Sequence, residues 1–152
     1  MDVQLHIRRY NPEQDEAPHW EEYAVSAEPT DRVLDLLHQV KWYQDGTLTF
    51  RRSCAHGVCG SDAMLINGRN RLACEYLVKD AGTRITVEPI RGLPVVKDLL
   101  VDMEPFWDQY KSVKPFLVND EVPPDGKERR QSQADRDRYE DTSRCILCAA
   151  CT

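Results

Sequence analysis

The chain has 152 residues, with 20 Lys and Arg against 26 Asp and Glu, a formal net charge of −6 and 41% hydrophobic residues. This length accommodates one ordinary domain or two small ones, and the acidic balance argues against a nucleic-acid partner, because nucleic-acid binders are normally basic. The mean hydropathy is −0.61, and the apolar runs fall far short of the roughly 20 residues that a membrane span requires. The opening residues, MDVQLHIRRYN, have neither the apolar core of a signal peptide nor the pattern of a transit peptide.

The first forty residues predict two strands and one helix. Apolar residues alternate along 3–9, and 20–27 is a second strand candidate, so we expect a hairpin of the two. Residues 31–42 carry apolar side chains at helical spacing, and either Thr30 or Asp31 can cap that helix.

The next sixty residues predict a long loop between short strands. Residues 47–50 form a short strand at best, and 51–62 show no periodicity and contain two glycines, which indicates a loop. Asn67-Gly68 is a strong signal for a tight turn. The apolar segments around it are strand candidates: 63–66, 71–74 and 84–90. This order of elements suits a small α+β domain, in which one helix covers a mixed sheet, that ends near residue 102.

The remainder of the chain has a different character. Asp102 can cap a helix that tolerates Pro105 in its first turn and ends before Pro115. Its apolar face would consist of Phe106, Tyr110 and Val113. Residues 119–136 are polar and punctuated by Pro and Gly, which predicts an exposed connector, and 135–144 is compatible with a helix.

Six cysteines form two tight groups separated by a long interval: Cys54, Cys59 and Cys74, then Cys145, Cys148 and Cys151. Disulfides are one interpretation of an even number of cysteines. The chain shows no export signal, however, and clustered cysteines in a reducing compartment more often bind metal or perform redox chemistry. We therefore expect two metal-binding groups.

The first group matches the plant-type [2Fe–2S] spacing C-x4-C-x2-C…C, with Asp62 where the third cysteine would stand. Such a cluster needs four anionic ligands, and a carboxylate carries the same charge as a thiolate. The spacing therefore predicts Cys54, Cys59, Asp62 and Cys74 as ligands of the cluster. In the alternative, Asp62 is a nearby solvated acid and water or another residue binds the iron.

Two other metal centres remain open for this group. Three cysteines and an aspartate could hold Zn²⁺, although structural zinc sites favour paired C-x2-4-C knuckles. Cys54-Ala55-His56 faintly suggests a Rieske centre, but that centre needs two histidines and none follows His56.

The second group, Cys145-x2-Cys148-x2-Cys151, matches three quarters of the bacterial [4Fe–4S] run C-x2-C-x2-C-x3-C-P. The sequence ends at Thr152, before a fourth cysteine. We therefore expect three ligands of a [4Fe–4S] cluster whose fourth ligand is missing from these residues. A zinc half-site or three idle thiols are the alternatives.

Four segments together resemble the iron–sulfur subunit of succinate dehydrogenase, the respiratory complex II family: SCAHGVCGSDAMLINGRNRLAC, GLPVVKDLLVDM, YKSVKPFL and CILCAAC. The resemblance covers roughly residues 3–152, and CGSD with the Cys74 spacing is narrower than a generic ferredoxin loop. The iron–sulfur subunit of fumarate reductase is a close alternative, but CGSDAM and CILCAAC favour the succinate dehydrogenase side.

The resemblance implies a β-grasp (plant-type) ferredoxin domain over 1–102 and the start of an α-helical ferredoxin-like domain over 103–152. It assigns Cys54, Cys59, Asp62 and Cys74 to [2Fe–2S], and Cys145, Cys148 and Cys151 to [4Fe–4S]. The family's [3Fe–4S] ligands and quinone-contacting residues would follow Thr152, so we expect the front piece of a longer subunit.

The resemblance also implies a role as an electron relay with no catalytic residue of its own. Electrons would come from the FAD of a flavoprotein subunit and continue toward a membrane quinone, with membrane anchor subunits as further partners. The expected location is peripheral, on the cytoplasmic face of a bacterial inner membrane. A free-standing ferredoxin-like carrier and a non-redox zinc-binding module are the alternative functions.

Overall fold

The structure, a computed structural model, describes residues 1–116 and 118–151. Its strands are β1 (Asp2–Arg9), β2 (His19–Ser26), β3 (Ala63–Ile66), β4 (Arg69–Leu72), β5 (Arg84–Pro89), β6 (Val95–Lys97) and β7 (Leu100–Val101). Its helices are α1 (Val33–Tyr43), α2 (Val78–Ala81), α3 (Glu104–Ser112), α4 (Gln133–Asp137) and α5 (Glu140–Ser143).

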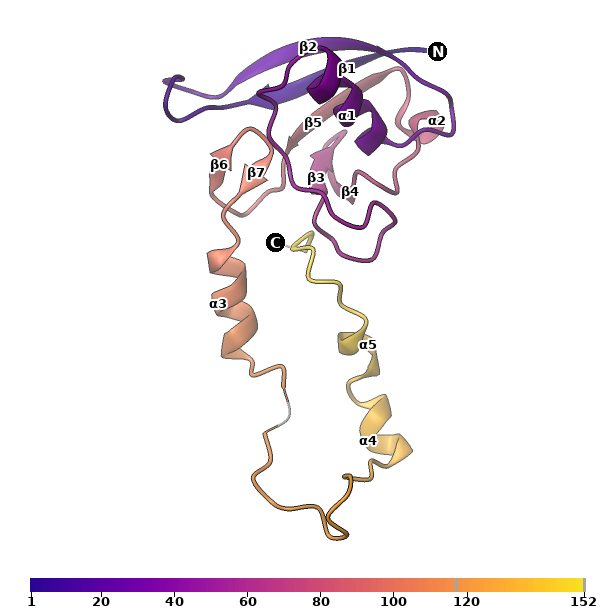
Figure 1. The fold of residues 1–152 in the computed structure, drawn as a ribbon, viewed down its shortest axis with the longest axis vertical. Helices are drawn as coiled ribbons and strands as arrows, with labels where there is room; N and C mark the ends of the chain where they lie inside the picture. The colour runs from indigo at the N-terminus through magenta and orange to yellow at the C-terminus, as the bar shows by residue number, and fades with distance from the viewer. Residues whose placement is uncertain (117, 152) are drawn as a thin grey trace.

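Five strands form one mixed sheet in the order β2-β1-β5-β3-β4, and β6 pairs with β7 in a separate ribbon (Figure 1). The predicted hairpin of β1 and β2 is confirmed, with Leu5 opposite Tyr23. The central pair, β1 and β5, is parallel. Asn67 and Gly68 connect β3 to β4 with φ of 49° and 75°, the pair of positive values that a type I′ turn requires. The predicted α+β class, with one helix on a mixed sheet, is therefore confirmed.

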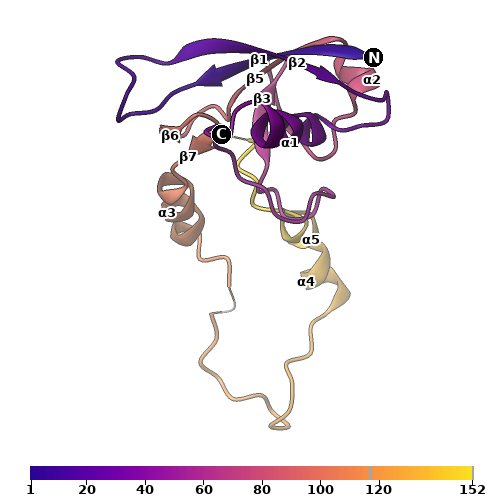
Figure 2. The ribbon, with the colours of Figure 1, turned by 45° about the horizontal axis from the view of Figure 1, so that its top comes forward.

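The core lies between the sheet and α1, which crosses one face of the sheet in both ribbon views (Figures 1 and 2). Side chains alternate between the two faces of β1, so every second one is buried. The apolar residues of α1 recur with the 3.6-residue period of a helix and pack against this buried face. The fully buried side chains that meet there include Leu5, Ile7, Leu34, Leu37 and Ile85.

The expected cap of α1 is wrong. The N-cap is Arg32, because Arg32 forms a bridge with Leu77 and stays extended. The first amides of the helix donate hydrogen bonds to backbone carbonyl groups and not to a side chain of Thr30 or Asp31. Val33 donates to the Tyr76 carbonyl and Leu34 to the Ala73 carbonyl, each at 3.0 Å. This docks the start of α1 onto the segment that carries Cys74.

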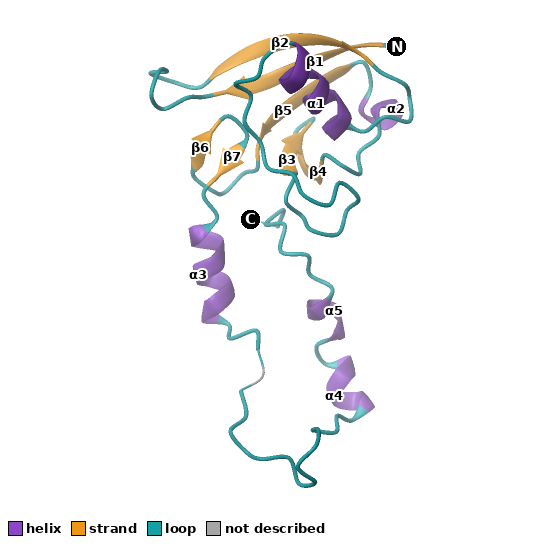
Figure 3. Ribbon diagram, viewed as in Figure 1, coloured by secondary structure: helices purple, strands orange, loops and turns teal. Residues whose placement is uncertain are grey.

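After the sheet the chain leaves as one arm and returns as another (Figures 1 and 2). Helix α3 starts where Asp102 accepts a hydrogen bond from the Glu104 amide at 2.9 Å, and it ends before Pro115 as predicted. Val113 lies beyond the helix end and is 73% exposed, so it does not extend the expected apolar face. An exposed, loop-rich connector follows, and the stretch expected to be one helix is divided into α4 and α5 (Figure 3).

The returning arm ends beside the sheet, close to β3 and β4 and to the long loop that precedes them (Figures 1 and 2). This return brings the two cysteine groups into the same region of the molecule. None of the helices in the described part of the chain is long and apolar enough to cross a membrane.

Candidate metal centre

The loop between α1 and β3 curls around the thiols of the first cysteine group. Three of its residues have left-handed backbone conformations: Ala55, Gly57 and Gly60, with φ of 59°, 77° and 68°. Alternation of left-handed with ordinary residues turns successive N–H groups toward one side of the chain, which makes a concave site for negatively charged groups. The predicted loop is thus an ordered structure that presents donors.

The sulfur atoms of the first group are the acceptors of those donors. The amides of Cys54 and Ser61 donate to Cys59 Sγ, each at 3.4 Å. The amides of His56 and Cys59 donate to Cys54 Sγ at 3.5 and 3.3 Å, and the Gly57 amide donates to Cys74 Sγ at 3.2 Å. Hydrogen bonds of this kind stabilise negative charge on sulfur and tune the potential of an iron–sulfur cluster.

Asp62 and Cys74 close the site from the sheet side. Cys74 lies two residues after the end of β4, and Asp62 directly precedes β3, so the hairpin holds the two side by side. Asp62 Oδ2 accepts a hydrogen bond from the Cys74 amide at 2.6 Å, and Oδ1 lies 3.4 Å from Cys74 Sγ. Asp62 is 2% exposed, so the alternative of a solvated acid is wrong.

Asp62 is a buried acid that lies beside the Cys74 thiol. Within the described part of the chain, its side-chain partners are the amide and thiol of Cys74, and no Lys or Arg pairs with it. A buried charge is costly unless it is paired or binds a metal ion. The arrangement therefore suits a cation shared between Asp62 and Cys74.

The thiols of the group differ in acidity. Hydrogen bonds from the side chain and backbone of Ser61, and from Cys54, lower the pKa of Cys59 to about 6. Burial raises the pKa of Cys74 to about 11, and the adjacent Asp62 contributes to that increase. Cys59 is therefore a ready anionic ligand, whereas Cys74 becomes one when a metal ion compensates the charge of Asp62.

Two further features shape the loop. A Cβ atom added to Gly57 would lie 2.1 Å from Glu75 Oε1, so glycine permits the Glu75 side chain to cover the loop. His56 is exposed, and its Nδ1 lies 2.6 Å from the Cys54 carbonyl oxygen. That nitrogen is engaged with the loop's own backbone, which gives no support to the Rieske alternative.

A buried arginine that sequence reasoning missed holds the base of the loop. Arg9, 6% exposed, donates from Nε to Asp98 Oδ1 at 3.0 Å and from Nη2 to Thr47 Oγ1 at 2.9 Å. Asp98 Oδ2 in turn accepts a hydrogen bond from the Thr49 amide at 2.8 Å. The guanidinium also contacts Glu21, Tyr23 and Asp45. The network ties residues 47–49, immediately before the loop, to β1 and to the turn between β6 and β7.

The second cysteine group is more open. Cys145 and Cys151 are exposed and Cys148 is half-buried. Leu147 and Ala149 have φ of 57° each, so this segment also curls, and the Leu147 amide donates to Cys145 Sγ at 3.4 Å. The segment therefore presents its thiols on a curled backbone, as the first loop does.

This second segment docks onto the sheet region. Asn70 of β4 donates from Nδ2 to the Ala150 carbonyl at 3.0 Å. Ala149, 2% exposed, packs in an apolar cluster with Ile90, Val101 and Met103.

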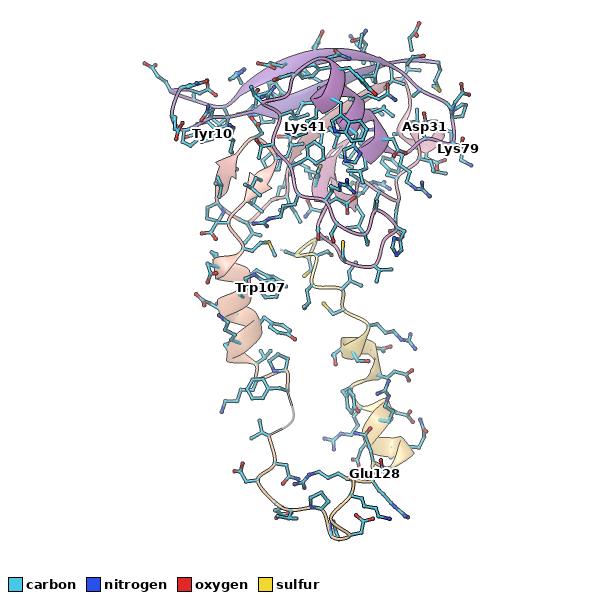
Figure 4. All side chains as sticks on the ribbon, in the orientation of Figure 1. Tyr10, Asp31, Lys41, Lys79, Trp107 and Glu128 are labelled. Carbon is cyan, nitrogen blue, oxygen red and sulfur yellow. The ribbon has the colours of Figure 1, made fainter. Side chains whose placement is uncertain are left out.

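A cavity of about 350 Å³ lies between the two groups. It is lined by Cys59 and Cys148 and by apolar side chains that include Leu99, Met103 and Trp107. Figure 4 shows Trp107 projecting from α3 toward the returning arm.

All six cysteines are free thiols in the described structure, so the disulfide interpretation is wrong. Within residues 1–116 and 118–151, no three Cys, His, Asp or Glu side chains are grouped as a site for one metal ion. The first group nevertheless fits a [2Fe–2S] cluster by its chemistry, because it combines three thiols and a carboxylate with backbone amides directed at sulfur.

The sequence matches the family described as "2Fe-2S iron-sulfur cluster binding domain" over residues 4–108. The chain therefore belongs to the 2Fe-2S iron–sulfur cluster binding domain family. Within that class it is similar to subunits of one enzyme, and the resemblance to succinate dehydrogenase iron–sulfur subunits is confirmed.

The similarity extends over almost the whole chain. A succinate dehydrogenase iron–sulfur subunit of Coxiella burnetii is 45% identical over 96% of this chain and 62% of its own length. A mitochondrial counterpart from Oryza sativa subsp. japonica is 44% identical over 96% of this chain and 53% of its own length. A chain in the structure "Mycobacterium smegmatis Sdh1 complex in the apo form" has a TM-score of 0.86 and 30% identity, over 99% of this chain and 62% of that chain. The present chain thus spans between 53% and 62% of the length of these relatives.

Proposed function

We propose that this chain carries electrons as the iron–sulfur part of a succinate dehydrogenase, and that Cys54, Cys59, Asp62 and Cys74 hold a [2Fe–2S] cluster. The observation that carries the proposal is the set of backbone amides directed at the sulfur atoms of all three cysteines, with the buried Asp62 beside Cys74. When bound, the cluster supplies reversible one-electron transfer. The loop amides stabilise the additional negative charge of the reduced state and so raise its potential.

The second cysteine group belongs to the same proposal. Cys145, Cys148 and Cys151 contribute three thiolates to a [4Fe–4S] cluster, and the fourth ligand comes from outside the described residues. Their placement beside the first loop, held by Asn70 and by the apolar cluster around Ala149, supports a second centre adjacent to the first. On this basis the domain that carries the first cluster covers residues 1–102, and 103–152 begins a helical domain.

The similarity to succinate dehydrogenase subunits supports a set of proposed partners. A flavoprotein subunit with FAD supplies electrons from succinate, and membrane anchor subunits hold the assembly at the cytoplasmic face of a membrane, where quinone accepts the electrons. This chain contributes the ligands and the donors that tune them, and no catalytic residue.

Native purification tests this assignment. Anaerobic isolation from membranes should yield a coloured protein together with a flavin-containing subunit, and succinate should bleach its visible absorbance. A coloured chain that isolates alone and does not respond to succinate would instead be a free-standing carrier. A colourless protein without iron would contradict both redox functions and favour zinc.

Substitution of Asp62 tests the ligand set. Asp62→Cys should retain a [2Fe–2S] spectrum with a changed midpoint potential, because a thiolate is a softer and more covalent ligand than a carboxylate. Asp62→Ala should lose the cluster or alter its spectrum. If Asp62→Ala leaves both the spectrum and the potential unchanged, Asp62 is not a ligand.

A further inference from the structure

The two cysteine groups approach each other closely at Gly60, the residue after Cys59. A Cβ atom added at this position would lie 2.6 Å from Cys148 Cβ, 2.8 Å from Cys148 Cα and 3.0 Å from the Ile146 carbonyl oxygen. Real Cβ atoms essentially never approach other heavy atoms within 3.0 Å, and two of these three neighbours are backbone atoms. Any side chain at residue 60 would therefore push the second group away from the first loop.

We propose that Gly60 is a positioning residue that sets the separation of the two cysteine groups. Because it lacks a side chain, the backbone of Cys148 packs directly on the loop that carries Cys59. Electron tunnelling weakens exponentially with distance, so this contact keeps two redox centres close. That consequence rests on the proposed function, whereas the positioning itself does not require either cluster.

The chain supplies a matched control for backbone strain. Gly60 and Gly68 have similar left-handed φ values, 68° and 75°, so alanine is strained to a similar extent at both. No heavy atom lies within 4 Å of a Cβ built on Gly68. A difference between Gly60→Ala and Gly68→Ala therefore reports the contact with Cys148.

The test compares amide hydrogen exchange of residues 145–151 in wild type, Gly60→Ala and Gly68→Ala, each purified anaerobically with its native partners. Gly60→Ala should exchange at least about tenfold faster in this segment, because overpacking of a close contact forces the backbone to shift. Gly68→Ala should stay within about twofold of wild type. Equal rates in Gly60→Ala and wild type, or equal acceleration in both variants, would overturn the proposal.

A spectroscopic readout separates positioning from general loosening. In protein that carries both clusters, spin relaxation of the first centre is accelerated by a nearby paramagnetic second centre. Gly60→Ala should lose this enhancement and Gly68→Ala should retain it. Retention in Gly60→Ala would contradict the proposal. If the wild type holds no iron, the proposed function fails, and the exchange comparison still decides the role of Gly60.

A third variant applies if Gly60→Ala does not fold. Asn70→Ala removes the other tether of the segment, the hydrogen bond to the Ala150 carbonyl, and leaves Gly60 intact. If Gly60 positions Cys148, exchange at the Leu147 amide, which donates to Cys145 Sγ, should stay within about twofold of wild type in Asn70→Ala. A larger acceleration at Leu147 would show that Gly60 does not hold the segment.

Discussion

The two cysteine groups use similar local chemistry in different surroundings. In the first, the loop curls over a packed sheet and helix, Cys74 is buried, and Arg9 secures the base of the loop. In the second, Cys145 and Cys151 are exposed, and the segment meets the sheet region through Asn70, Ala149 and Gly60. The comparison indicates that the first cysteine group is organised by the sheet and helix around it, whereas the second depends on contacts made at one end of a long arm.

The largest expected effect separates the two groups. Cys59→Ala should abolish the [2Fe–2S] absorbance and EPR signal, because it removes one of the proposed ligands, a thiol whose pKa is lowered to about 6. Cys151→Ala should leave that signal intact, since Cys151 is exposed and belongs to the second group. Iron content and the visible spectrum of the two variants measure this. Loss of the [2Fe–2S] signal in Cys151→Ala would show that the groups are not independent sites.

The next effect concerns the support of the first loop. Arg9→Met should lower the free energy of unfolding of the sheet region by about 3–5 kcal/mol, the usual cost of breaking a buried ion pair. It leaves Asp98, 2% exposed, without its guanidinium partner. Urea unfolding followed by the fluorescence of Trp20 and Trp42 measures the change. A loss below about 1 kcal/mol would place the pair among surface ion pairs and contradict its structural role.

The same network makes stability depend on pH at both extremes. Burial by itself would raise the pKa of Asp45, but hydrogen bonds from Thr47 and Arg9 outweigh it and hold that pKa well below its ordinary value of 3.8. The stabilisation is complete above that value and should be lost as the pH falls below it. Burial raises the pKa of Tyr23 above 10.0, and Glu21 and Asp45 add to the shift, so that contribution should be lost as the pH rises above 10.

Two substitutions test which residue causes the loss of stability at low pH and which causes the loss at high pH. Asp45→Asn should flatten the acid limb of the free energy of unfolding against pH, and Tyr23→Phe should flatten the alkaline limb. Unfolding curves at several pH values provide the measurement. An acid limb that is identical in Asp45→Asn and wild type would rule out Asp45 as its source.

The smallest effect belongs to the returning arm. Arg144 pairs with Glu140 across one helical turn at 3.2 Å, and both side chains are substantially exposed. Arg144→Ala should therefore change the free energy of unfolding by about 0.3–0.5 kcal/mol at most. Thermal unfolding of the two proteins side by side tests this. A change comparable to that of Arg9→Met would mean that the arm is as integral to the fold as the sheet.

Local patterns predicted the elements of the sheet well. Alternation identified β1 and β5, the segment 20–27 was correctly predicted as the strand β2, helical spacing identified α1, and Asn67-Gly68 identified the turn before Cys74. The lack of periodicity and the two glycines of residues 51–62 identified a loop, and amides of that loop donate to the sulfur atoms of Cys54 and Cys59. These features depend on residues that are near one another in the sequence.

The features that the sequence did not predict depend on residues far apart in the chain. Arg9 and Asp98 are 89 positions apart, and nothing in a local pattern pairs them. The predicted cap of α1 was wrong because the carbonyls of Ala73 and Tyr76, and not a capping side chain, accept the hydrogen bonds of the first helical amides. The contact of Gly60 with Cys148 required the return of the arm to the sheet, which a polar connector does not reveal.

EPR of the anaerobically purified, dithionite-reduced protein tests the central claim most directly. We expect a [2Fe–2S] signal with a spin count equal to the chain concentration, present in wild type and Cys151→Ala and absent in Cys59→Ala. An EPR-silent reduced protein, or a signal that survives in Cys59→Ala, would contradict the assignment of a [2Fe–2S] cluster to Cys54, Cys59, Asp62 and Cys74.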